Sequence, residues 1–91
     1  MKLFWTAKAL GDLDRLYRFL APANPRAAAG VVRQLSAAPQ RLLENPRLGL
    51  RLEEFGSREV RRIVIGSYEI RYQIAGEEII VLRLFHARED R

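Results

Sequence analysis

The feature that most constrains this chain is the two-residue alternation of apolar and polar residues in its second half. The segment "VRRIVIGSYEIRYQI" (60–74) reads as two strands joined at Gly66-Ser67, and "IIVLRLFH" (79–86) reads as a third strand. Glycine at the first position of a two-residue loop suits a type II′ hairpin. Alternating apolar residues indicate strands with one buried face. The second half therefore predicts an antiparallel, three-stranded sheet.

The first half has a helical period. "KLFWT" (2–6) reads as a short strand because of its bulky apolar residues. Thr6 can cap a helix, and the apolar residues that follow recur at helical spacing. Asn24 followed by Pro25 signals the start of a second helix, which Pro39 should kink or split. The order β-α-α-β-β-β predicts an α+β fold, with a helical hairpin packed on one face of an antiparallel sheet, in a single domain spanning 1–91.

The register of the strands predicts where the arginines lie. The two-residue loop of the first hairpin places Arg62 opposite Arg71. In the second hairpin, a three-residue loop (76–78) is needed to put Leu82 on the core face, and it places Arg71 opposite Arg83. These three arginines should form a row, the arginine row, on the sheet face that points away from the helices.

The same register leaves Val81 and Phe85 exposed beside the arginine row, with Arg88 in the polar tail that follows. Like charges opposite each other destabilise a sheet, so a basic row beside exposed apolar side chains exceeds what solubility requires. We interpret these residues as the binding surface for an acidic, partly apolar partner. In the alternative interpretation, Glu69 and neighbouring acids neutralise the row.

The composition agrees with a basic binding protein. The chain has sixteen lysine and arginine residues and eleven acidic residues, which gives a formal charge of +5. Lys2 and Lys8 are the only lysines. Arginine favours two-pronged contacts with carboxylates or phosphates, so we expect an acidic protein or a nucleic acid as partner. Alternatively, the charge serves solubility alone.

Other classes of protein are disfavoured. The chain has no cysteine and one histidine, so we expect no disulfide, no metal site and no cofactor. No apolar run is long enough to span a membrane, and the first residues do not resemble a signal peptide. We therefore expect a soluble, cytoplasmic protein.

Several segments, taken in order, resemble one known family. They are Trp5 ahead of a helix with Leu10 and Leu13, "NPRAA" (24–28), "NPRLG" (45–49), "YEIRY" (68–72), and "IIVLRLFHARED" (79–90) with Arg83 and "HAR" inside it. In this order and spacing the chain resembles the RelE/ParE superfamily of toxins from type II toxin–antitoxin pairs, and is most similar to the ParE branch. The resemblance implies a cognate antitoxin whose C-terminal segment wraps the toxin in a hetero-oligomer. For the ParE branch it also implies inhibition of DNA gyrase.

The RelE branch offers a different chemistry, the cleavage of mRNA on the ribosome. Metal-free RNA cleavage needs a base, an acid and cations for the phosphate. Here Arg62 and Arg83 can supply cations, and His86 can transfer a proton. The RelE branch, however, typically has lysines around its site and a tyrosine near the C-terminus, whereas no tyrosine follows Tyr72. Alternation also places His86 at a strand end, where it can hydrogen-bond to Tyr68.

Three hypotheses about function follow. The first is a toxin that inhibits gyrase, is not an enzyme and has no catalytic residues. The second is a ribosome-dependent mRNA endonuclease that acts through Arg62, Arg83 and His86. The third is a degenerate paralogue that only binds an antitoxin. The missing lysines and tyrosine favour the first hypothesis over the second.

Overall fold

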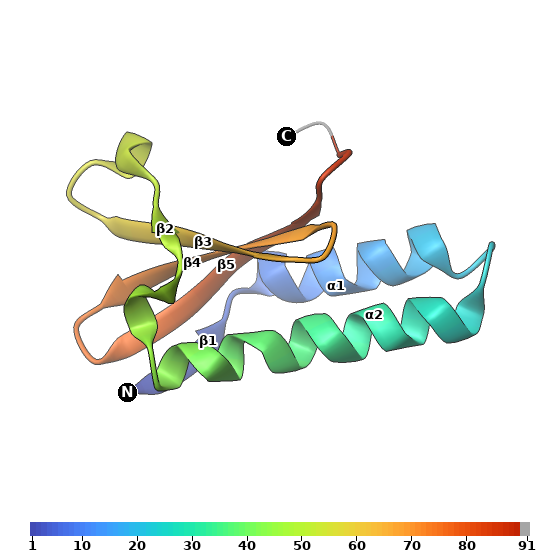
Figure 1. The fold of residues 1–91 in the computed structure, drawn as a ribbon, viewed down its shortest axis with the longest axis horizontal. Helices are drawn as coiled ribbons and strands as arrows, with labels where there is room; N and C mark the ends of the chain where they lie inside the picture. Colours follow the sequence, from blue (N-terminus) through green and yellow to red (C-terminus); the bar gives the residue numbers. More distant parts are fainter. Residues whose placement is uncertain (90–91) are drawn as a thin grey trace.

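The computed structural model describes residues 1–89 and places two helices on one face of a five-stranded sheet (Figure 1). The α+β fold predicted from the sequence is confirmed. The strand order across the sheet is β1-β5-β4-β3-β2. In chain order the elements are β1 (Lys2–Trp5), α1 (Ala7–Leu20), α2 (Pro25–Ala37), the 3₁₀ helices η1 (Ala38–Leu43) and η2 (Pro46–Leu48), β2 (Leu50–Arg51), the 3₁₀ helix η3 (Glu53–Phe55), β3 (Glu59–Ile65), β4 (Tyr68–Ala75) and β5 (Glu78–His86).

Both helices begin at the residues that the sequence indicates. The Thr6 hydroxyl accepts a hydrogen bond from the Ala9 N–H at 3.0 Å and caps α1. Asn24 caps α2 in the same way, and Pro25 follows it at the first helical position. Pro39 lies in the first turn of η1, where the α-helix tightens into a 3₁₀ helix, so the predicted break is confirmed.

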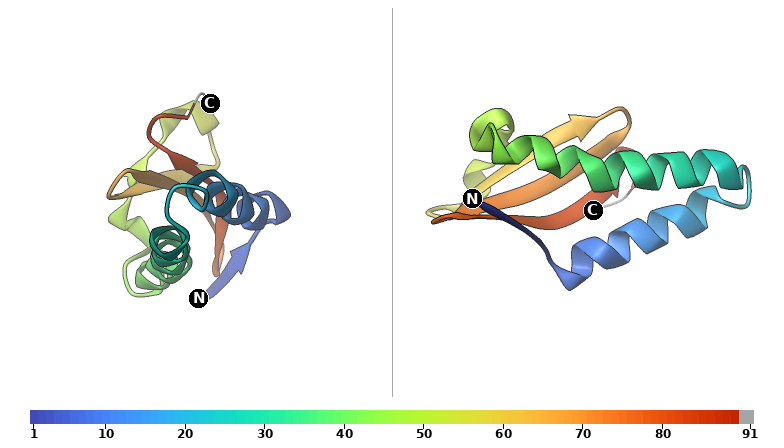
Figure 2. Two further views of the ribbon diagram at one scale, coloured as in Figure 1. Left: turned by 90° about the vertical axis from the view of Figure 1, so that its right-hand side faces the viewer. Right: turned by 90° about the horizontal axis from the view of Figure 1, so that it is seen from below.

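The helical hairpin packs along the sheet, and its tip, between α1 and α2, reaches beyond the ends of the strands (Figures 1 and 2). Leu16 of α1 and Leu35 of α2 are almost fully buried against the strands. This buried apolar layer covers one face of the sheet, so the opposite face is the one that carries no helix within residues 1–89. The core cluster consists of Ala9, Leu16, Leu35, Ala38, Leu42, Ile63, Ile70, Tyr72, Ile74, Ile79, Val81 and Leu84.

The first hairpin has the predicted register. Ile65 pairs with Tyr68, and Arg62 pairs with Arg71. Gly66 has φ of 60°, the left-handed conformation that the first loop position of a type II′ turn requires. The core face of β4 is therefore the predicted one.

The second hairpin reaches the predicted arginine pairing by a different route. Arg71 pairs with Arg83 as predicted, but the loop has two residues instead of three, because Ala75 pairs with Glu78. The extra residue of β5 lies within the strand instead of in the loop. Arg71 pairs with Arg83 and Tyr72 pairs with Val81, so Leu82 between them is unpaired and forms a β-bulge. The predicted three-residue loop is therefore wrong.

The bulge changes which side chains of β5 face the helices. Val81 joins the core cluster with 0% exposure, whereas Leu82 leaves that face and lines a hollow on the surface. The prediction that Val81 is exposed is wrong for this reason. The carbonyl oxygens at the bulge are satisfied by Thr6, whose hydroxyl donates to Leu82 O at 2.9 Å and whose N–H donates to Val81 O at 3.0 Å.

The two edges of the sheet are formed by short strands. β1 pairs with β5 in a parallel orientation, which makes the sheet mixed, while β3, β4 and β5 are antiparallel as predicted. At the other edge, β2 pairs with β3 through two residues only. No helix in the described part of the chain has the length and apolar character of a membrane span.

Candidate partner-binding surface

A hollow of about 630 Å³, here called the basic hollow, opens beside β5 on the open face of the sheet. Its cations come from four different segments: α1, the connection before β3, β4 and β5. Among the described residues, its lining contains no acidic side chain. Such a concave, cationic surface suits an anionic group. The lining residues are Thr6, Lys8, Phe55, Arg58, Arg71, Leu82, Arg83 and Phe85.

Phe85 forms a support under two of these cations. The guanidinium carbons of Arg71 and Arg83 lie 5.3 and 4.9 Å from the centre of the Phe85 ring. This distance is within the range of favourable cation–π contacts. Phe85 is only 8% exposed, so the prediction that its side chain is exposed is wrong. The ring instead holds the two guanidinium groups beside each other.

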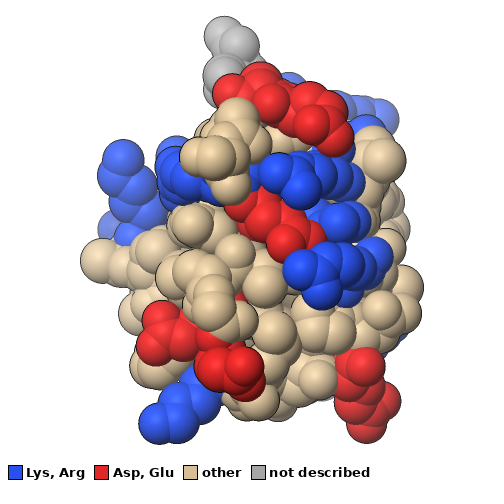
Figure 3. All heavy atoms as spheres, turned by 90° about the vertical axis from the view of Figure 1, so that its left-hand side faces the viewer, with Lys and Arg blue, Asp and Glu red and all other residues tan. Residues whose placement is uncertain are grey.

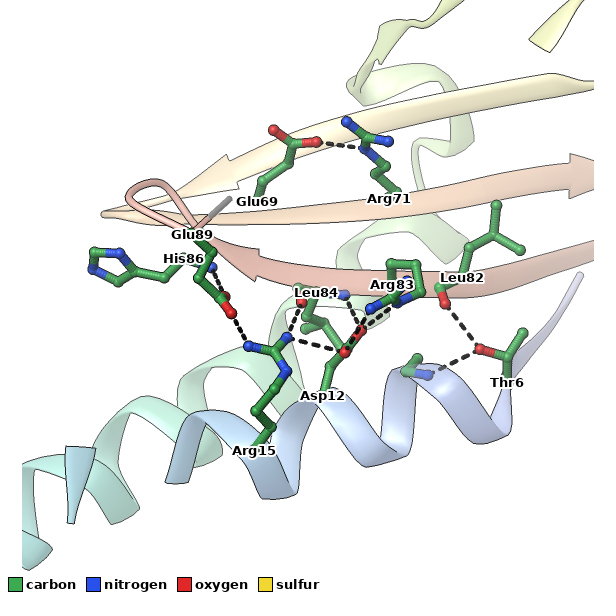
Figure 4. A network of polar contacts seen from close by, with 11 residues as sticks. Thr6, Asp12, Arg15, Glu69, Arg71, Leu82, Arg83, Leu84, His86 and Glu89 are labelled. Carbon is green, nitrogen blue, oxygen red and sulfur yellow. Dashed lines mark hydrogen bonds and ion pairs between the residues drawn. The ribbon is translucent and has the colours of Figure 1, made fainter. Parts of the chain in front are cut away.

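A buried carboxylate on α1 fixes the position of Arg83 (Figure 4). Asp12 is 4% exposed and accepts hydrogen bonds from Arg83 Nε at 2.8 Å, Arg83 Nη2 at 3.1 Å and the Leu84 N–H at 2.8 Å. Arg15 donates to the same carboxylate at 3.0 Å and also pairs with Glu89 of the tail. Asp12 therefore joins α1 to β5 and holds Arg83 at the rim of the basic hollow.

One signal in the sequence points to this role of Asp12, namely its position on the helix. Asp12 lies three residues after Ala9 and four before Leu16, both of which are buried, so it occupies a core position of the helix. Burial by itself raises the pKa of the Asp12 carboxyl. The hydrogen bonds from Arg83, Leu84 N–H and Arg15 outweigh this effect and hold the pKa below its usual value.

Asp12→Asn is expected to lower the free energy of unfolding at neutral pH by about 2 kcal/mol, because charge-assisted hydrogen bonds are replaced by neutral ones. A carboxyl with a lowered folded pKa contributes stability above its unfolded pKa, near 3.9, and this contribution is lost as the pH falls through the folded pKa. Urea unfolding at a series of pH values should therefore show the two proteins converging below about pH 4.

The matched control for this experiment is Asp14→Asn on the same helix. The Asp14 side chain is 62% exposed and pairs with Arg18 on the surface, so its loss should change stability by less than about 0.5 kcal/mol. A stability difference between the unmutated protein and Asp12→Asn that stays constant from neutral to acid pH would contradict the assigned role of the Asp12 charge.

The arginine row exists, but acids divide it. Arg71 Nε donates to the nearly buried Glu69 at 2.6 Å, and Arg62 Nη1 donates to the same carboxylate at 3.4 Å. Arg62 lines a second hollow and not the basic hollow. The interpretation that Glu69 neutralises part of the row is thus correct for Arg62 and Arg71. Acidic side chains also lie among basic ones at the end of the molecule where β2 and η3 lie (Figure 3).

The three residues of the nuclease hypothesis do not converge. Arg62 and Arg83 line different hollows, and His86 lines neither. Figure 4 shows the His86 ring pointing away from Arg83. The ring packs edge-on against Tyr68 with 5.1 Å between the centres, and its Nδ1 accepts from the Arg88 N–H at 3.0 Å. The contact with Tyr68 is thus a ring contact; within the described residues no hydrogen bond joins the two side chains.

Of the eight residues that line the basic hollow, the sequence predicted three as partner-binding: Arg71, Arg83 and Phe85. Lys8, Phe55 and Arg58 lie on α1 and around η3, far along the chain from β4 and β5, and their spacing carries no signal that they meet. Arg88 is exposed in the tail and does not line the basic hollow. In the part of the chain that the structure describes, no group of three histidine, cysteine or acidic residues is placed to hold a metal ion.

Known proteins resemble this chain over nearly its whole length. The sequence model of the family described as the ParE toxin of the type II toxin–antitoxin system parDE matches residues 3–91. Two curated proteins of Caulobacter vibrioides are similar: Toxin RelE2 (33% identity, 94% of each chain) and Toxin RelE1 (35% identity, 94% of this chain and 92% of the relative).

Two solved structures have the same fold. The chromosomal ParDE system of P. aeruginosa superposes with a TM-score of 0.79 at 24% identity, covering 97% of both chains. The toxin–antitoxin complex RelBE2 of Mycobacterium tuberculosis superposes with a TM-score of 0.61 at 26% identity, covering 97% of this chain and 92% of the other.

Proposed function

Because this chain belongs to the ParE family of toxins from type II toxin–antitoxin systems, we propose that it inhibits DNA gyrase by binding, without cutting RNA, and that a cognate antitoxin neutralises it. The family supplies the class of protein. The choice between binding and cleavage rests on the residues around the basic hollow.

The composition of the basic hollow is the observation that supports binding. Cleavage of RNA without a metal needs a base and an acid placed at the reacting atoms. The described lining has four cations but no histidine, carboxylate or tyrosine. Lysine is adapted to acid–base work by burial, and Lys8 is exposed. The hollow can therefore hold an anionic group but lacks the groups that would move its protons.

The same hollow suits an antitoxin segment. Phe55 and Leu82 add apolar surface beside the cations, which fits a peptide that carries both acidic and apolar side chains. The similar structure from Mycobacterium tuberculosis is a toxin–antitoxin complex, which supports an antitoxin as partner and a hetero-oligomer as the neutralised form. The antitoxin then covers the charge that the free toxin presents.

The purified protein is expected to inhibit DNA supercoiling by gyrase, or to trap gyrase on DNA, and to leave mRNA on ribosomes intact. His86→Ala should keep its toxicity in cells, measured at matched levels of soluble protein, because His86 packs on Tyr68 and lies outside the basic hollow. Induction of the DNA-damage response, with no block of translation, is the expected cellular effect.

Two other outcomes would decide against this proposal. The nuclease is the second candidate for two reasons: four cations around one hollow also suit RNA phosphates, and two similar proteins carry the name RelE. Ribosome-dependent cleavage by the unmutated protein, lost in His86→Ala, would therefore establish the nuclease. A protein that binds its antitoxin but is inactive in both assays would be the degenerate paralogue.

A further inference from the structure

The sheet has an unfilled position at its β2 edge. β2 pairs with β3 only at Arg61 and Arg62, whereas β3 continues to Ile65. Continuing the same register would put Leu48 opposite Val64, but Leu48 has turned into η2 and its N–H donates to Asn45 O at 3.1 Å. The last three residues of β3 therefore have a partner strand on the β4 side only.

The backbone of Val64 points into this gap. Val60 O accepts from the Leu52 N–H at 2.8 Å, so the backbone groups of Val60 point away from β4. Alternate residues of a strand direct their N–H and C=O groups to the same side, and Val64 is four residues further on. β2 does not pair with Val64, and among the described residues no backbone hydrogen bond from a turn or loop reaches its N–H or C=O. One donor and one acceptor are thus available at an edge.

The gap is also hollow and lined with apolar side chains and two cations. Its volume is about 300 Å³. Leu48, Leu50 and Val64 are 47, 63 and 60% exposed, which is high for large apolar residues gathered at one place. Arg41 and Arg62 stand beside them. Unpaired strand edges are the sites at which proteins add a strand from a partner.

We propose that an extended segment of the cognate antitoxin adds to the sheet here, pairing with Val64 and placing apolar side chains on Leu48 and Leu50 and a carboxylate near Arg41 or Arg62. The inference rests on the proposed antitoxin partner. It assigns that partner a contact separate from the basic hollow, because the two hollows share no lining residue.

A second copy of this chain fits the gap less well. Each copy carries a formal charge of +5 and would bring its own Arg41 and Arg62 to the same edge. Only residues 63–65 are free to pair, so two copies would share few hydrogen bonds. An acidic segment instead gains from both the arginines and the apolar side chains.

Amide hydrogen exchange of the unmutated toxin, measured by NMR with and without the antitoxin, tests the proposal directly. The Val64 amide should exchange rapidly in the free toxin and ~10-fold or more slowly in the complex, because pairing closes it off from water. A Val64 amide that exchanges equally fast in both states would overturn the inference. If the antitoxin does not bind at all, the proposed partner fails instead, so the two failures are distinguishable.

Variants provide the second measurement. Val64→Pro removes the outward N–H without touching the hydrogen bonds between β3 and β4, and should weaken antitoxin binding by ~10-fold, whereas Val64→Ala keeps the N–H and should weaken it less. Arg41→Glu should also weaken binding, more strongly at low salt. Equal affinities for Val64→Pro and Val64→Ala, or a free toxin that is dimeric through this edge, would count against the antitoxin as the added strand.

Discussion

Gly49→Ala is expected to lower the free energy of unfolding by about 3 kcal/mol, enough to leave much of the protein unfolded if its stability is ordinary. A Cβ at this position would lie 2.5 Å from Arg62 O and 2.8 Å from the Tyr72 hydroxyl oxygen. One neighbour is backbone of the central hairpin and the other is a fully buried ring, so neither can move aside without cost.

The cause is close packing and not backbone conformation. Gly49 has φ of −80° and ψ of 157°, which alanine adopts readily. The Tyr72 hydroxyl donates to Pro46 O at 2.7 Å and accepts from the Gly49 N–H at 2.9 Å, which draws the chain onto the ring. Arg61 Nη1 donates to Gly49 O at 2.7 Å and so adds a further bond that holds Gly49 in this position.

Urea unfolding of two further variants identifies the cause. Gly11→Ala makes the same substitution in α1, where a Cβ meets nothing within 4 Å, and should be neutral or stabilising by up to about 1 kcal/mol. Tyr72→Phe should cost about 1–3 kcal/mol, because it leaves the Gly49 N–H and Pro46 C=O without their partner. If Gly49→Ala is as stable as Gly11→Ala, the close approach at Gly49 is wrong.

Reversing two charges of the basic hollow, with Lys8→Glu and Arg58→Glu together, is expected to weaken antitoxin binding by ~100-fold at low salt. Both residues are exposed, and neither has the buried carboxylate partner that Arg71 and Arg83 have. The fold should therefore tolerate the double change, and the loss should come from repulsion of the acidic segment.

The control has the same change in net charge at another place. Arg26→Glu with Arg33→Glu alters two exposed arginines of α2 that line neither hollow. Titration calorimetry at low and high salt should separate the two double variants at low salt and bring them closer at high salt, where screening shortens the reach of the charges. Equal affinities of both variants at low salt would show that the basic hollow is not where the antitoxin binds.

The sequence by itself determined the elements that depend on a few neighbouring residues. Thr6 and Asn24 start the helices because their side chains bond to N–H groups three residues ahead. Gly66 sets a two-residue turn, and this turn fixes the pairing of Arg62 with Arg71. These features were predictable because the interactions that cause them lie within a few residues of the sequence.

Only the tertiary structure decided which residues line the basic hollow. The second hairpin can gain its extra residue in the loop or within the strand, and both choices pair Arg71 with Arg83. The extra residue lies within the strand because Val81 packs into the core and Thr6 hydrogen-bonds to the carbonyl oxygens at the bulge. That choice buries Val81, turns Leu82 toward the basic hollow, and could not be derived from alternation, because alternation assumes an uninterrupted strand.

The charges of the surface were likewise settled by contacts between distant segments. Asp12 is 71 residues before Arg83, and it reaches that arginine only because α1 lies against β5. Lys8 and Arg58 join Arg71 and Arg83 for the same reason. The sequence predicted a basic face of the sheet. The packing of α1 and η3 around the sheet determined which cations line the hollow and which are held by buried acids.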